Sequence, residues 1–426
     1  MNPSTVELLG AVLFGLAVFH TFMVGKILDF SHRFPKDSAA ASLLHFAGEI
    51  EVVFGLWGAL LLIVMGVMNG FGSVVEYQSQ LHFTEPIFVF CIMVIAATKP
   101  VLWLAQKLIQ GLSLVLAHAT KLPQVLVDVF ILLVVGPLAG SFITEPAAMT
   151  VTALLLARMI HRVNENLMYV ALAVLFVNVS IGGALTPYAA PPILMVASKW
   201  GWDLATVFSH FGWKAASAVT INAFFFVLFF RLKLRSHLHP LKVVADSETM
   251  PFSVVGLHYA FLVLVVLCAH YPALAMGTFL FFLGMTAVTS QYQDRIRLKE
   301  ALLVAFFLGG IIVFGPLQAW WLTPVLKSLN SIGLFLSATA LTAVTDNAAL
   351  TFLGSQVEGL SESSKYFLVA GAIAGGGLTI IANAPNAAGF SILQDKFPNG
   401  VHPGRLLIAA LAPTLIAVLF LGFMPG

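Results

Sequence analysis

The chain has 426 residues, of which 59% are hydrophobic and only 9% are charged, and its formal net charge at pH 7 is +2. A soluble domain typically carries about 25% charged residues. The composition therefore excludes a soluble globular protein and indicates an all-helical, polytopic membrane protein. The small net charge gives no reason to expect a nucleic-acid partner.

The apolar runs predict the membrane spans, because a helix that crosses a bilayer needs about 20 apolar residues. No basic segment precedes the first run, so we expect that run to remain as a helix rather than to be removed as a signal peptide. Two further stretches, 122–160 and 329–357, are interrupted and are predicted as re-entrant hairpins. Helices are predicted over 5–26, 46–68, 86–107, 167–197, 204–230, 252–272, 273–290, 301–321, 366–392 and 404–424.

A seven-residue motif occurs in closely similar form inside both predicted hairpins. It reads Thr-Glu-Pro-Ala-Ala-Met-Thr at 144–150 and Thr-Asp-Asn-Ala-Ala-Leu-Thr at 345–351. Each copy is followed by a second shared motif, Gly-Gly-Ala-Leu-Thr at 182–186 and Gly-Gly-Gly-Leu-Thr at 375–379. Paired motifs of this kind are typical of secondary transporters that are built from internal repeats.

Both glycine motifs predict a broken helix. Glycine weakens a helix, and in both copies a proline follows closely, which cannot continue the normal hydrogen bonding of a helix. Close packing of small residues between helices is the alternative interpretation, but glycine and proline together in both copies favour breaks. The glycines concerned are Gly182 and Gly183 in the first copy and Gly375, Gly376 and Gly377 in the second.

Glu145 and Asp346 are the candidate proton- and cation-coupling residues. A charged side chain at the centre of a bilayer costs about 2.5–3.5 kcal/mol, so an acid at the same place in two motifs needs a reason. The structural alternative is that each acid pairs with a lysine in the membrane. Lys99 is available for such a pair, and Glu51 is another candidate partner for it. The duplication favours a functional role.

Side chains that carry oxygen lie close to both acids in the sequence. Together with the unpaired backbone groups of a broken helix, they can replace the water shell of a small hard cation. Asp346 and Asn347 are the candidate ligands of Na⁺ itself, and the second copy is the richer in polar side chains. The predicted cation-binding residues are Thr144, Thr186, Thr345, Asn347, Thr379, Asn383 and Asn386.

The distribution of Lys and Arg predicts the orientation. With the N-terminus outside, Lys99 falls within the membrane and, of the 21 Lys and Arg, only Lys199, Lys214, Lys327 and Lys365 fall outside, in agreement with the positive-inside rule. Both termini then lie outside, and the two hairpins enter from opposite sides. This predicts inverted repeats of about five helices plus one hairpin each, at 1–230 and 252–426, joined by a cytoplasmic linker at 231–251.

At these motifs the chain resembles the ion transporter superfamily, and within it the sodium/proton antiporter family. Residues 343–350 resemble the acid-Asn hairpin tip of the antiporter and arsenite branches, and residues 376–389 resemble their broken-helix motif. The resemblance implies a scaffold and a transport domain, often a dimer, and an elevator-like movement. Dicarboxylate carriers have neutral Ser-Asn-Thr at both tips, so the two acids disfavour that branch. Pro146 stands where the first tip would carry an Asn.

The resulting hypothesis is a transporter rather than an enzyme. It would lie in the cell membrane among lipids and exchange Na⁺ or Li⁺ for H⁺, with no cofactor besides the transported ions. One alternative is an ion-coupled transporter of an anion or oxyacid, of the arsenite or dicarboxylate type. Another is a membrane protein that does not transport, such as a receptor, although a passive bundle gains nothing from duplicated helix breaks.

Overall fold

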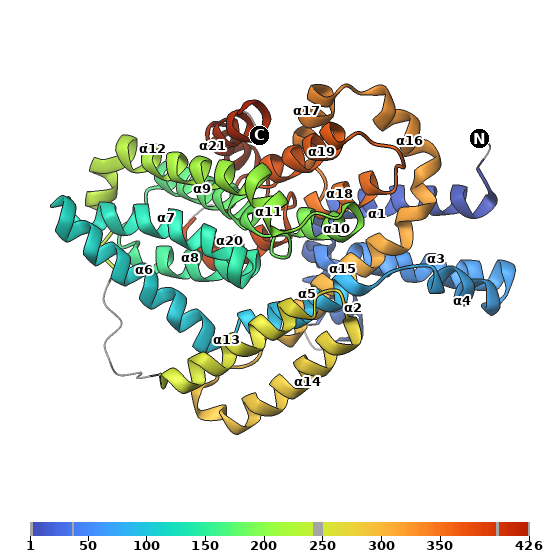
Figure 1. Cartoon of the computed structure of the whole chain (residues 1–426), viewed down its shortest axis with the longest axis horizontal. Coiled ribbons are helices and arrows are strands. Elements are labelled where there is room, and N and C mark those ends of the chain that lie inside the picture. The colour runs from blue at the N-terminus through green and yellow to red at the C-terminus, as the bar shows by residue number, and fades with distance from the viewer. Residues whose placement is uncertain (1–2, 36–37, 242–249, 398–399, 425–426) are drawn as a thin grey trace.

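The computed structural model describes residues 3–35, 38–241, 250–397 and 400–424, and helices dominate all four ranges (Figure 1). Within these ranges the β-type pairing is limited to an isolated antiparallel bridge between Ile160 and Leu238. The prediction of an all-helical protein is therefore confirmed. Residues 242–249, which belong to the predicted linker, lie outside the described residues.

The protein is a multi-pass membrane protein. In the described ranges, seven helical segments are long and apolar enough to cross a membrane. The bent pair of α4 (Phe71–Ser79) and α5 (Thr84–Ala96), with an angle of 70°, brings the number to eight if it is counted as one span. Shorter apolar helices accompany them. The seven spans are Thr5–Ser31, Lys99–Thr120, Gln124–Ile143, Glu165–Leu185, Leu204–His237, Leu298–Ser328 and Pro403–Phe423.

One group of helices, which we call the bundle, shares a hydrophobic core in which Val, Phe and Ala are the most frequent side chains. Its helices come from the first part of each half of the chain, and Figure 1 shows several of them on the right and at the bottom. They are α1 (Thr5–Ser31), α3 (Val53–Asn69), α5 (Thr84–Ala96), α13 (Phe252–Leu267), α14 (Pro272–Val288) and α15 (Leu298–Phe314).

A second group, the hairpin body, has a separate hydrophobic core that brings the later parts of both halves together. Most of its helices lie in the upper part and on the left of Figure 1. They are α7 (Gln124–Ile143), α8 (Glu145–Met159), α9 (Glu165–Gly182), α10 (Pro191–Trp200), α12 (Trp213–His237), α17 (Ser331–Thr342), α19 (Glu362–Gly375), α20 (Ala384–Leu393) and α21 (Pro403–Phe423). Helix α18 (Asn347–Ser355) has no residue in this core, but it packs on α10, α17 and α19 and we include it in the hairpin body.

Helix α6 (Lys99–Thr120) joins the two cores. Val101 belongs to the core of the bundle, whereas Ile109 and Ala117, farther along the same helix, belong to the core of the hairpin body. The hairpin tips also reach across, because Ala147 of α8 and Ala348 of α18 pack into the bundle core. The remaining helices are α2 (Ala39–Ala47), α4 (Phe71–Ser79), α11 (Leu204–Val207) and α16 (Ala319–Ser328).

The predicted helix 86–107 is wrong as a single element, because the chain breaks between α5 and α6. Thr98 is extended, with φ −75° and ψ 150°, and its hydroxyl donates to the carbonyl of Ile95 at 2.6 Å. Pro100 lies in the first turn of α6, where a helix needs no N–H from it. The proline thus starts a helix instead of kinking one.

The helix before the predicted linker is longer than the predicted range 204–230. Helix α12 continues through the basic segment to His237. Arg, Lys and Leu form helices well, so the change from apolar to charged residues marks where the helix becomes polar, not where it ends.

The bundle depends on a close approach of α3 and α15 at glycine. A Cβ on Gly58 would lie 3.3 Å from the Cα of Gly310, and a Cβ on Gly310 would collide with the backbone of Phe54. The neighbouring Gly309 has room, because its nearest atom beyond α15 would be in the ring of Phe83, at 3.7 Å.

Gly310→Ala is therefore expected to push α3 and α15 apart and to destabilise the protein by about 1–3 kcal/mol, the usual effect of overpacking. Thermal unfolding of the purified protein in detergent measures this as a lower Tm. Gly309→Ala is the matched control and should unfold close to the wild type. Equal Tm values for the two variants would contradict the close approach.

Candidate functional site

The first hairpin consists of α7 and α8, which pack along each other and meet at Thr144. Thr144 has φ 74° and ψ 150°, and within the described residues its hydroxyl has no hydrogen-bond partner. Glu145 is the first residue of α8 and is completely buried, and Pro146 fits the first turn of that helix. The predicted tip thus carries its acid into the interior of the hairpin body.

The helix that follows this hairpin breaks at the glycine motif. Helix α9 ends at Gly182, a single 3₁₀ turn follows at Gly183–Leu185, and α10 begins only at Pro191. A Cβ on Gly182 would lie 2.6 Å from the carbonyl oxygen of Pro137, and a Cβ on Gly183 would collide with Oε1 of Glu145. These glycines therefore allow the break to lie directly against the first hairpin.

The second hairpin consists of α17 and α18, with Asp346 at its tip. Asp346 is the N-cap of α18, and its Oδ1 accepts the N–H groups of Ala348 at 2.8 Å and Ala349 at 3.1 Å. The N–H of Ala384, at the start of α20, also faces this carboxylate. Asp346 therefore lies at the positive ends of two short helices, which favour a negative charge.

The second break connects the two tips. Helix α19 ends at Gly375, and α20 begins at Ala384. Between them, Asn383 donates from its Nδ2 to Oε2 of Glu145 at 2.8 Å. The backbone N–H of Asn347 donates to the carbonyl of Ala382 at 3.0 Å. The break in the second half of the chain thus contacts both hairpin tips.

The predicted threonine ligands mainly brace the backbone. The hydroxyl of Thr186 donates to the carbonyl of Ser141 at 2.8 Å, and that of Thr379 donates to the carbonyl of Ala343, also at 2.8 Å. Each bond ties a helix break to the end of the first helix of its hairpin. The hydroxyl of Thr345 donates within the second hairpin, to Leu341 at 2.9 Å.

The two hairpin tips have equivalent positions in space, but the equivalent residues differ by one position from those that the sequence motifs align. Glu145 and Asn347, not Glu145 and Asp346, are the first residues of α8 and α18. Glu145 lies against Gly183, and the Nδ2 of Asn347 lies against Gly376, which is the second glycine of its own motif. Asp346 therefore lies one position before the place that Glu145 occupies in the first hairpin.

Several buried polar atoms around the tips have no hydrogen-bond partner within the described residues, although buried polar groups are normally satisfied. The side chains that carry them are Thr144, Glu145, Asn347, Asn383 and Asn386, each with a free oxygen. All five are predicted site residues. Carboxylate, amide and hydroxyl oxygens are the ligands that hard cations prefer, so the hairpin body provides such ligands close to both breaks.

Asp346 and Asn347, the two candidate Na⁺ ligands, face different surroundings. Asn347 is completely buried against Gly376, whereas Asp346 is half-buried and lines a cavity of about 20 Å³. Glu51 of the bundle lines the same small cavity. These two neighbours in the sequence thus differ in exposure: Asn347 lies among the buried polar side chains, and Asp346 is the more accessible of the two.

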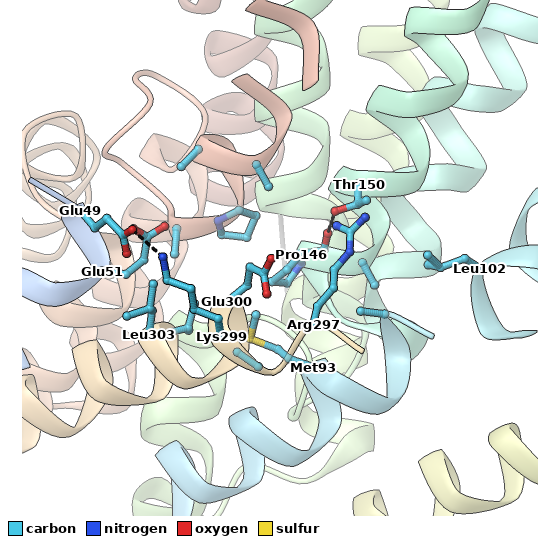
Figure 2. A pocket seen from close by; sticks show the side chains of 18 residues that line it. Glu49, Glu51, Met93, Leu102, Pro146, Thr150, Arg297, Lys299, Glu300 and Leu303 are labelled. Atoms are coloured by element: carbon cyan, nitrogen blue, oxygen red, sulfur yellow. Dashed lines mark hydrogen bonds and ion pairs between the residues drawn. The ribbon is translucent and has the colours of Figure 1, made fainter. Parts of the chain in front are cut away.

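A wider cavity of about 320 Å³ adjoins the small one and shares four of its lining residues, Glu51, Val304, Ala384 and Ala387. Figure 2 shows its charged lining: Glu49 forms an ion pair with Lys299 at 2.9 Å, Glu51 lies beside this pair, and Arg297 extends on the other side toward Thr150. Arg297 and Lys299 are not among the site residues that the sequence predicts. Arg297 is the N-cap of α15 and Lys299 lies in the first turn of this helix, and two basic residues at the start of an apolar helix are the signal that could have pointed to them.

The predicted pair of Lys99 with Glu51 is not the pair that the structure shows. The Nζ of Lys99 lies 4.0 Å from Oδ1 of Asp294, an exposed acid between α14 and α15. Lys99 begins α6, after the break in the predicted third helix. That break places Lys99 at the first residue of the span Lys99–Thr120, where it can meet a loop.

Thr186→Val and Thr379→Val are each expected to lower the free energy of unfolding by about 0.5–1.5 kcal/mol, because a backbone carbonyl loses its donor. Thermal unfolding in detergent measures the effect, and the double variant should show the sum because the two bonds brace different hairpins. Thr345→Val is the control: the carbonyl of Leu341 still accepts the N–H of residue 345. A control as unstable as the other variants would contradict the bracing role.

A comparison with known proteins and protein families shows the family to which the chain belongs. None of the curated proteins matches the chain. A family model described as "Putative Na+/H+ antiporter" matches residues 5–424, which is nearly the whole chain and includes both hairpins and both breaks. The chain therefore belongs to this family of Na⁺/H⁺ antiporters.

Proposed function

We propose that the chain is a secondary antiporter that exchanges Na⁺ or Li⁺ for H⁺, and that Asp346 is the acid that carries the proton and the cation in turn. The observation that carries this proposal is the position of the Asp346 carboxylate. It lies at the start of α18 beside the broken helix, and it lines a cavity that continues into the wider one. The family match supports the choice of Na⁺ and H⁺ as the ions.

The geometry of Asp346 suits exchange. Two backbone N–H groups hold Oδ1, and the helix ends favour the ionised carboxylate, so the group is stable after it releases its proton. An ionised carboxylate attracts a cation through its negative charge, whereas a protonated carboxyl group is neutral and lacks this attraction. Proton and cation must therefore compete for Asp346, and this competition couples their movements.

Glu145 has a different role in this proposal. Its Oε2 is held by Asn383, its Oε1 has no partner among the described residues, and none of its surface is exposed. A buried negative charge without compensation is very unfavourable. A cation bound between Glu145 and the free oxygens of Asn383 and Thr144 would supply that compensation from within the hairpin body.

The two separate cores support alternating access. The hairpin body contains both tips and both breaks, and it contacts the bundle through small side chains such as Ala147 and Ala348. We propose that the hairpin body moves against the bundle in an elevator-like step. Both termini lie on the outer side of the cell membrane in this proposal. The wide cavity with Arg297 and Lys299 is then the cytoplasmic entrance, in agreement with the positive-inside rule.

Asp346→Asn is expected to lower Na⁺-driven proton flux in proteoliposomes at least about 100-fold, since an amide keeps the volume but cannot release a proton. Glu145→Gln should cause a smaller loss, because the amide oxygen can still accept from Asn383. Asp395→Asn changes an exposed acid after α20 and serves as the control, with flux close to the wild type. Wild-type flux in the Asp346→Asn protein would refute the proposed role.

The apparent affinity for Na⁺ is expected to weaken as the pH falls, because protonation of Asp346 removes the charge that binds the cation. Isothermal titration of Na⁺ at several pH values measures this dependence. When Na⁺ binds to protonated Asp346, the carboxyl group should release one proton per bound ion into the buffer. Added oxyanions or dicarboxylates should change the affinity only through ionic strength. Na⁺ binding that is independent of pH, and that requires an anion, would instead support an anion carrier.

A further inference from the structure

We propose that Glu51 is a proton-relay residue, which passes the proton between Asp346 and the water of the wide cavity. This inference rests on the antiporter function proposed above, and it adds a positioned carboxylate on the bundle side of the pathway.

Glu51 belongs to the bundle, and Asp346 belongs to the hairpin body. Glu51 lies in the 3₁₀ turn Ile50–Val52 between α2 and α3, and this turn packs on α15. It lines both the small cavity that contains Asp346 and the wide cavity. The other residues that line both are Val304, Ala384 and Ala387, which carry no side-chain group that can bind a proton.

The size of the small cavity favours a relay. A volume of about 20 Å³ holds about one water molecule. A proton that leaves Asp346 therefore passes over about one water before it reaches the boundary with the wide cavity, where a carboxylate can accept it. Glu51 is the carboxylate at that boundary.

The surrounding charges leave Glu51 free for this task. Lys299 is held by Glu49 at 2.9 Å, and His45 lies 3.6 Å from the same Glu49 oxygen. Glu51 itself has no ion pair within 4.0 Å to another described residue, while Glu49, Lys299 and Asp346 interact with it electrostatically. The ion pair thus fixes the neighbouring charges without blocking the carboxylate of Glu51.

The proton steps balance without any further reactant. Protonated Asp346 donates its proton to the water between the two carboxylates, and that water donates one of its own protons to Glu51. Asp346 is then ionised and ready for a cation, and Glu51 is protonated. Glu51 finally releases the proton to the water of the wide cavity and returns to its ionised form. The reverse sequence loads Asp346.

Two exchange assays in proteoliposomes distinguish a relay from a structural role. Na⁺/H⁺ exchange needs the relay, whereas exchange of labelled Na⁺ for unlabelled Na⁺ moves no net proton and needs only the cation site. In Glu51→Gln we expect Na⁺/H⁺ exchange to be at least about 10-fold slower and Na⁺/Na⁺ exchange to stay within about twofold of the wild type. Glu51→Asp keeps a carboxyl group and should have an intermediate rate of Na⁺/H⁺ exchange.

Glu300→Gln is the matched control, because Glu300 lines only the wide cavity and its side chain is exposed; both exchanges should remain at the wild-type rate. If Glu51→Gln slows both exchanges equally, or slows neither, the relay is refuted. Those results leave the antiporter function intact as long as the wild type exchanges Na⁺ for H⁺ and Asp346→Asn does not. Absence of exchange in the wild type would instead refute the proposed function itself.

Discussion

The site depends on the need of every buried backbone N–H and C=O for a hydrogen-bond partner. Two helices end inside the hairpin body, and an unsatisfied group in apolar surroundings costs several kcal/mol. Ser141 accepts the N–H of Leu185 and donates to the carbonyl of Gly182, at 2.9 and 2.7 Å. In the second break, Asn386 donates to the carbonyls of Gly376 and Thr379. These polar side chains thus provide partners for backbone groups at both breaks.

This constraint explains how far the candidate site could be predicted from the sequence. The repeated motifs identified both acids, because an acid in an apolar run stands out, and they identified the glycines, because a break needs them. The motifs could not show that the hydroxyls of Thr186 and Thr379 would donate to backbone carbonyls of the hairpins. Nor could they show the bond between Asn383 and Glu145, which joins residues separated by 238 positions. Long-range contacts of this kind require the packing of the hairpins.

The one-residue offset between the tips could not be predicted either. The motifs align Glu145 with Asp346, but the start of each helix depends on local backbone chemistry. Asp346 caps α18 with its own carboxylate, whereas Thr144 makes no such bond and Pro146 fits the first turn of α8. The two acids therefore have different neighbours, one sealed and one beside a cavity. Two similar motifs thus place their acids in different surroundings.

For the fold, the sequence predicted most helices but not how they group. The predicted division at residues 231–251 separates the halves along the chain, whereas each of the two cores draws helices from both halves. The bend at Thr98 was missed because Pro100 supports either a kink in a helix or the start of one. Each core is therefore complete only when residues from both halves of the chain are present.

The backbone of Thr144 has an energetic consequence for the first hairpin. Its φ of 74° and ψ of 150° lie at the border of a region that is favourable almost only for glycine, and such a conformation costs about 1–3 kcal/mol. The peptide directly before Glu145 therefore stores strain in the conformation described here. Release of that energy would shift an equilibrium between two tip conformations by a factor of about 5–150. One hydrogen bond to a charged group contributes a similar free energy, so a single new contact at the tip would be enough to offset this strain.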